Sequence, residues 1–114
     1  MNETKEIKLR GKTYPVAFTM ATVLSYEEIA DRSFFNEQFQ RIRERMMLIF
    51  AAIYAANPKA DITMDDIMGT DDWGEFNEAF NVVMKMATDF FKVPKVTEEL
   101  EPEPTDEKDE KAKN

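Results

Sequence analysis

Residues 6–35 read EIKLRGKTYPVAFTMATVLSYEEIADRSFF, and their pattern is the most informative one in the chain. Its first half alternates apolar and polar residues on both sides of Gly11, which is the pattern of two short strands joined by a tight turn. Its second half begins with Thr19, a residue that commonly caps a helix, and continues with helix-compatible residues. The sequence therefore predicts a β-hairpin that leads directly into a helix at Met20–Asp31.

The turn determines which hairpin residues face each other. With Gly11-Lys12 as a two-residue loop, the glycine supplies the positive φ that such a loop needs. Leu9 then pairs with Tyr14, and Ile7 pairs with Val16. In this register the larger apolar side chains share one face, and they are Ile7, Leu9, Tyr14, Val16 and Phe18. Because an isolated hairpin is only marginally stable in water, we expect this face to pack on helices.

Two longer helices are predicted by apolar residues that recur at steps of three and four. The first is Glu37–Ala56, with Asn36 as its cap. From Met46 onward it is apolar nearly all round, which predicts the centre of the core. The second is Asp71–Lys92, with Thr70 as its cap. The side chains assigned to the buried faces of the three helices are Met20, Val23, Leu24, Ala30, Phe39, Ile42, Met46, Ile49, Phe50, Ile53, Trp73, Phe76, Phe80, Val83, Ala87 and Phe90.

A short helix is predicted between these two long helices. Thr63 and Asp66 have the spacing of a capping box, and Gly69 would end the short helix.

Taken together, these elements predict that residues 1–94 form one α+β, mostly α domain, with an N-terminal β-hairpin packed on three to four helices. Residues 95–114 carry many charges and few apolar side chains. They cannot offset about 1–2 kcal/mol of backbone entropy per residue, which predicts a disordered acidic C-terminal tail.

Composition removes several classes of function. The chain has no cysteine and no histidine, so it lacks disulfides, Ser-His or Cys-His pairs and the commonest metal ligand. Its net charge of −8 disfavours nucleic acids and anionic membrane surfaces. Met1–Arg10 is too charged for a signal peptide, and the apolar run Met46–Ala56 is shorter than the about 18 residues of a membrane span. We therefore expect a protein that is not an enzyme, uses no cofactor and binds neither nucleic acid nor membrane.

Three acidic pairs and an arginine cluster are the remaining charged candidates. The pairs are Glu27-Glu28, Asp65-Asp66 and Asp71-Asp72. Neighbours on a helix point about 100° apart, so a pair does not form a matched general acid and base. The two aspartate pairs suit first turns of helices, and with Asp61 they do not have the spacing of a calcium loop, so no metal site is expected. Arg41, Arg43 and Arg45 are assigned to a solvated helix face, with Glu37 paired to Arg41 one turn later.

Apolar residues are unusually abundant for a domain of this size. The chain has nine phenylalanines and eight methionines, most of which we assign to the core. Some are expected to form an exposed patch for a partner segment, because methionine repacks readily around different sequences. The residues assigned to this partner surface are Phe34, Phe35, Met47, Tyr54, Met84 and Phe91.

The order of these elements resembles the tail assembly chaperones of long-tailed bacteriophages and prophages. The resemblance covers about residues 6–91, and the segments that carry it are Ile7–Met20, Val23–Glu28, Ala51–Asn57 and Ile62–Ile67. The turn after the first helix departs from the pattern, because residues 30–33 read ADRS where many relatives carry a Thr-Gly-Lys-Ser-like segment.

This resemblance implies a cytoplasmic protein of a bacterial host cell that is not an enzyme. Such a protein would bind the tape-measure protein, keep its apolar helical segments soluble and help to recruit tail-tube protein. The alternative is another structural or adaptor protein of a phage or mobile element, without chaperone activity. A small carboxylate- or metal-dependent enzyme is the least favoured reading. The residues leave a homo-oligomer open.

Overall fold

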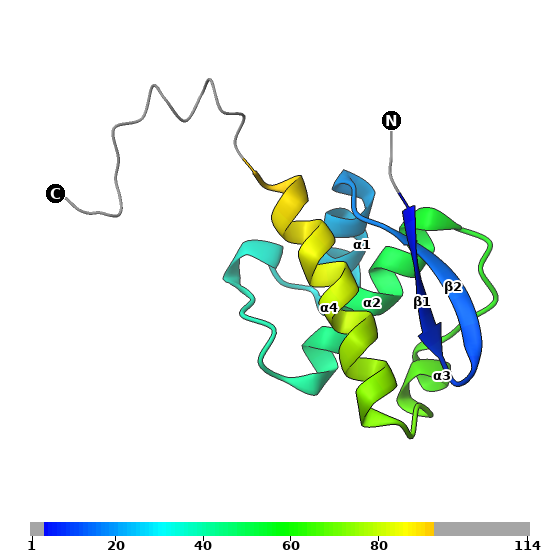
Figure 1. Ribbon diagram of the computed structural model, residues 1–114. Helices are drawn as coiled ribbons and strands as arrows, with labels where there is room; N and C mark the ends of the chain where they lie inside the picture. The colour runs from blue at the N-terminus through cyan, green and yellow to red at the C-terminus, as the bar shows by residue number, and fades with distance from the viewer. Residues whose placement is uncertain (1–3, 93–114) are drawn as a thin grey trace, which may run out of the picture.

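The computed structural model describes residues 4–92 and shows an N-terminal hairpin packed on helices (Figure 1). The predicted α+β, mostly helical fold is confirmed, and the predicted tail at 95–114 lies outside the described residues. The elements in chain order are β1 (Thr4–Leu9), β2 (Lys12–Ala17), α1 (Met20–Ala30), the short 3-10 helix η1 (Phe34–Asn36), α2 (Ile42–Ala56), α3 (Met64–Met68) and α4 (Trp73–Phe90). The hairpin packs on α2 and α4, and α2 lies between the other layers.

The hairpin turn is displaced from its predicted position. Leu9 pairs with Lys12 and Ile7 with Tyr14, so the register differs by two residues from the prediction. The turn residues are Arg10 and Gly11, with φ values of 55° and 79°, the signs found in a type I′ turn. The predicted Gly11-Lys12 loop is wrong because that prediction gave a positive φ to the glycine alone. A displacement of two residues keeps each side chain on its face, so the buried face was predicted correctly.

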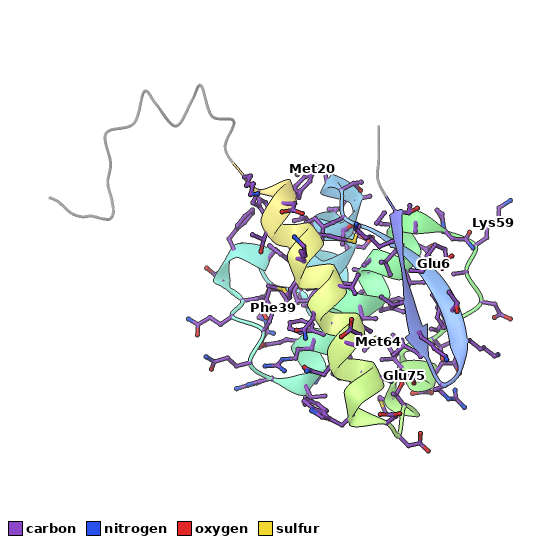
Figure 2. The ribbon with its side chains drawn as sticks, in the orientation of Figure 1. Glu6, Met20, Phe39, Lys59, Met64 and Glu75 are labelled. Carbon is purple, nitrogen blue, oxygen red and sulfur yellow. The ribbon has the colours of Figure 1, made fainter. Side chains whose placement is uncertain are left out.

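Glu75 on α4 stabilises the positive φ of Arg10. Its carboxylate accepts hydrogen bonds from the backbone N–H of Arg10 at 2.6 Å and of Gly11 at 3.4 Å. The Arg10 guanidinium also lies 3.6 Å from the Asp66 carboxylate on α3. Figure 2 shows Glu75 near the start of α4, on the side of the hairpin turn. The turn is therefore attached to two helices that are distant in the sequence.

The buried face of α1 differs from the prediction. Thr19 caps the helix as expected, but Met20 and Leu24 are 65% and 58% exposed, while Thr22, Val23 and Tyr26 are buried. The Thr22 hydroxyl accepts a hydrogen bond from the Thr19 N–H and donates one to the Ala17 carbonyl. These bonds hold the start of α1 against the end of β2 and turn Thr22, rather than Met20, toward the core.

The start of α2 also differs from the prediction. The helix begins at Ile42, not at Glu37, and Asn36 ends η1 instead of capping α2. Phe39 adopts a φ of 58°, a left-handed conformation that a continuous helix does not allow. The core side chains Leu48, Ile49 and Ile53 are fully buried, which confirms the apolar part of α2 as the centre of the core. Ile42, assigned to the buried face, is exposed.

The capping of the last two helices was predicted in part. Thr63 and Asp66 form the expected capping box of α3, and Gly69 follows its end. Asp72, and not Thr70, caps α4 by accepting a hydrogen bond from the Glu75 N–H at 3.2 Å. The residues of the α4 stripe that are buried are Phe76, Phe80, Val83 and Ala87, whereas its two ends, Trp73 and Phe90, are exposed.

A partly buried polar network joins α1 to the segment before α2. The Tyr26 hydroxyl donates to Glu37 at 2.9 Å, and the Arg32 guanidinium lies 2.8 Å from the same carboxylate oxygen. The Glu37 side chain is only 4% exposed, so its charge depends on these partners. Arg32 also lies 3.5 Å from Glu44. The predicted pair of Glu37 with Arg41 is therefore wrong, because Glu37 precedes α2 and faces α1.

This network predicts a dependence of stability on alkaline pH. Burial, and then the hydrogen bond to Glu37, raise the pKa of Tyr26 above its usual value of about 10. The unfolded chain therefore releases this proton first, so the stabilising contribution is complete below about pH 10 and is lost as the pH rises further. In urea titrations between about pH 9 and 11, we expect the free energy of unfolding to fall more steeply for the wild type than for Tyr26→Phe. Parallel pH profiles would contradict this prediction.

Candidate interaction surfaces

Exposed apolar side chains gather where the end of α4 meets the start of α1 and η1. We call Met20, Phe35, Phe90 and Phe91 the aromatic end patch. Phe35 is 70% exposed, and all four are exposed. Met20, labelled in Figure 2, begins α1 two residues after Phe18, whose ring packs on Phe90 and Phe91. Leu24 extends the exposed apolar surface by one turn along α1.

The turn after α1 points one phenylalanine inward and the next one outward. The Glu27 carboxylate of α1 accepts a hydrogen bond from the Phe34 N–H at 2.8 Å. The Ser33 hydroxyl accepts one from the Phe35 N–H at 3.2 Å and caps η1. These two bonds fix the backbone of the turn, so that Phe34 enters the core while Phe35 remains in solvent.

The exposed rings rest on a layer of buried rings. Phe34 lies at the centre, with ring centroids 5.7 Å from Tyr26 and 5.8 Å from Phe91. Phe91 also packs against the exposed Phe35 at 5.6 Å, and Phe90 packs against Phe18 at 5.3 Å. The aromatic end patch is therefore the outer layer of an aromatic cluster and is held in place from below. Positioned aromatic rings lose little conformational freedom on binding, which favours an interface.

The residues assigned to a partner surface from the sequence are dispersed by the fold. Phe35 and Phe91 belong to the aromatic end patch, whereas Phe34 lies beneath it. Met47 is buried in the core and, like Phe34, is covered in this conformation. The two others lie elsewhere: Met84 is half-buried against the core, and Tyr54 is exposed on α2, where it stacks on Phe50 with ring centroids 6.2 Å apart.

Sequence reasoning missed Met20, Leu24 and Phe90 because it placed all three on buried faces. The rotation of α1 depends on the hydrogen bonds of Thr22, and no local pattern marks Thr22 as a core residue. Phe90 continues a regular stripe and differs from the buried members only by lying at the end of α4. The one sign in the sequence that some of these side chains would be exposed was that the chain has more large apolar residues than a core of this size can hold.

A second apolar surface lies near the other end of α4. We call it the Trp73 groove, and its volume is about 380 Å³. The groove is lined by Ile42, Met46, Ile67, Met68, Thr70, Asp71, Asp72, Trp73 and Phe76. Ile42, Met68 and Trp73 are exposed, and Trp73 packs on Phe76 with ring centroids 5.8 Å apart. The oxygen of the Thr70 hydroxyl is buried and has no hydrogen-bond partner within residues 4–92.

The unpartnered hydroxyl of Thr70 predicts a stabilising substitution. A buried polar group without a partner costs about 1–3 kcal/mol, and valine has nearly the shape of threonine without that group. We expect Thr70→Val to raise the free energy of unfolding by about 1 kcal/mol and the Tm by roughly 4–8 °C. Thermal unfolding followed by circular dichroism tests this, with Thr13→Val on the exposed face of the hairpin as the control. An unchanged or lower Tm for Thr70→Val would contradict the assignment.

One member of each acidic pair has a structural role. Glu27 holds η1, Asp72 caps α4, and Asp66 caps α3. A hydrogen bond from the Thr63 N–H lowers the pKa of Asp66 below its usual value. In residues 4–92 no group of three or more acidic side chains could hold a metal ion, and no helix there has the length and apolar character of a membrane span.

Comparison with known proteins finds no relative of this chain. No protein-family model matches the sequence, and no curated protein or solved structure is significantly similar to it.

Proposed function

We propose that the protein is a tail assembly chaperone of a long-tailed bacteriophage or prophage. In this proposal the aromatic end patch receives an amphipathic helical segment of the tape-measure protein, and the complex helps to recruit tail-tube protein. The resemblance in the order of elements is the starting point. The observation that carries the proposal is the cluster of exposed rings, Phe35, Phe90 and Phe91, supported from below by Phe18 and Phe34.

The chemistry of the aromatic end patch suits an apolar helix stripe. Helices that bind in grooves place apolar side chains at steps of three and four against apolar surfaces. The exposed rings supply fixed contact area, and Met20 with Leu24 can repack along the same stripe. The chain carries a net charge of −8, which would keep a complex with an apolar partner dispersed by charge repulsion. Binding would therefore remove apolar surface of both molecules from water.

A co-expression experiment with the tape-measure protein tests the proposal. We expect the wild type to keep tape-measure fragments in the soluble fraction and to co-purify with them. The double variant Phe35→Ser, Phe91→Ser should lose this activity and weaken binding by at least about tenfold, because burial of each ring contributes about 1.5–3 kcal/mol. Phe35 is 70% exposed, whereas Phe91 also packs on Phe34, so circular dichroism must show that the double variant is folded.

Tyr54→Ser is the comparison variant for this experiment. Tyr54 is about as exposed as Phe91 but stacks only on Phe50 among the ring contacts of residues 4–92. We expect Tyr54→Ser to retain full binding. Failure of the wild type to bind any tape-measure fragment would reject the chaperone function. Equal losses for Tyr54→Ser and for the double variant would reject the aromatic end patch as the site.

A further inference from the structure

We infer that the Trp73 groove is a second binding site, and that it accepts a basic amphipathic helix of a partner protein. The inference goes beyond the proposed chaperone function and rests on different residues. Trp73 begins α4 and Phe90 ends it. The 18 residues of α4, at about 1.5 Å per residue, place the Trp73 groove and the aromatic end patch about 27 Å apart. One helix end therefore cannot occupy both.

The shape of the Trp73 groove suits a few large apolar anchors. Its floor contains the buried side chains Ile67 and Phe76, and its exposed edges are Ile42, Met68 and Trp73. The edges come from α2, α3 and α4, and the connection between α3 and α4 completes the lining with Thr70, Asp71 and Asp72. A volume of about 380 Å³ is large enough for two or three side chains of leucine size. An amphipathic helix presents such anchors at steps of three and four.

The charged residues at the Trp73 groove favour a partner helix with positive charge. Asp71 and Asp72 line it, and no lysine or arginine does. Both aspartates are exposed, and one carboxylate oxygen of Asp72 accepts the hydrogen bond that caps α4. Arg41 and Arg43, the chain neighbours of Ile42, line a separate depression together with Arg32 and Glu44. Lysine or arginine beside the apolar anchors would therefore meet complementary charge, whereas an acidic helix would be repelled.

The Trp73 groove combines exposed apolar edges with one sign of charge. Thr70 also lines it, but the oxygen of its hydroxyl is buried and has no partner in the described part of the chain. A bound segment would therefore be held by the apolar edges and the carboxylates and not by this hydroxyl.

Trp73 is the only tryptophan in the sequence, so its fluorescence reports directly on the groove. The probes are two designed helical peptides with leucine at steps of three and four, one flanked by lysine and one by glutamate at the same positions. We expect the lysine peptide to shift the Trp73 emission to shorter wavelength in a saturable manner. The glutamate peptide should bind at least about tenfold more weakly, because a few charge pairs of up to about 1 kcal/mol each change sign.

Three variants assign the binding to the groove. Met68→Lys, at a side chain that is 63% exposed, should abolish the shift by adding positive charge to the edge. Asp71→Asn with Asp72→Asn should weaken the lysine peptide several-fold while asparagine keeps the cap of α4. Phe35→Ser should change nothing. Circular dichroism verifies that each variant is folded.

Two results would overturn the inference: no saturable shift with the lysine peptide, or equal affinity for both peptides. Loss of binding in Phe35→Ser without loss in Met68→Lys would also reject it, because binding would then lie at the other end of α4. None of these results would reject the capture of tape-measure fragments at the aromatic end patch, so the two proposals can fail separately.

Discussion

Replacing Tyr26 with alanine is expected to lower the free energy of unfolding by about 3–5 kcal/mol, the range for a large buried ring. Tyr26 is fully buried, and its ring packs edge-on against Phe34 and Phe39. The substitution removes these contacts and also takes a partner from the buried Glu37 carboxylate. Small domains are commonly stable by only about 5–15 kcal/mol, so this loss would leave a marginal protein. Urea denaturation followed by circular dichroism measures it.

Tyr26→Phe separates the ring from the hydroxyl. Phenylalanine keeps the ring contacts but loses the hydrogen bond to Glu37, which retains Arg32 as a partner. We expect this variant to lose about 1–2 kcal/mol. If alanine and phenylalanine cost the same, the ring packing assigned to Tyr26 is wrong.

Replacing Arg45 with alanine is expected to lower the free energy of unfolding by about 2–3 kcal/mol. The Arg45 Nε–H donates a hydrogen bond of 2.7 Å to the Phe39 carbonyl, and charged donors contribute about 1.5–3 kcal/mol. The guanidinium also lies 5.0 Å from the centre of the Phe80 ring, which adds about 0.5–1 kcal/mol. Because Phe39 has a φ of 58°, its backbone needs such an external partner to remain in place.

The loss of Arg45 should also be visible in the loop before α2. We expect faster proteolysis at residues 37–41 in Arg45→Ala than in the wild type, together with the lower stability in urea. Arg43→Ala, on an exposed arginine of the same helix, is the matched control and should leave both unchanged. A stable Arg45→Ala variant with an unchanged cleavage pattern would show that Phe39 holds its conformation without Arg45.

In the hairpin, local patterns predicted the buried face but not the strand register. Alternation assigned Ile7, Leu9 and Val16 to the buried face, and the structure agrees. The predicted strand register was wrong. A shift of two residues leaves that alternation unchanged, so hydrophobicity cannot distinguish the predicted register from the observed one. What distinguishes them is Glu75, which binds the N–H groups of Arg10 and Gly11 from a distant helix. No pattern within the hairpin contains that contact.

The candidate surfaces were less predictable than the core. The abundance of phenylalanine and methionine indicated that some apolar surface would be left outside the core, and two of the assigned residues, Phe35 and Phe91, do lie together. The other members of the patch depend on how α1 is rotated and on where α4 extends past the core. Exposure of a side chain is a property of what packs next to it, so residue type alone does not assign it.

Local patterns in the chain were enough to predict the order of the strands and α-helices, the apolar face of the hairpin, the caps at Thr19 and Thr63 and the buried centre of α2. These depend on contacts between residues a few positions apart, and such contacts leave a period or a spacing in the chain. Long-range packing set the hairpin register, the late start of α2 and the two separate apolar surfaces. Those depend on Glu75, Arg45 and Thr22 reaching residues outside their own elements, and contacts of that kind leave no periodic trace.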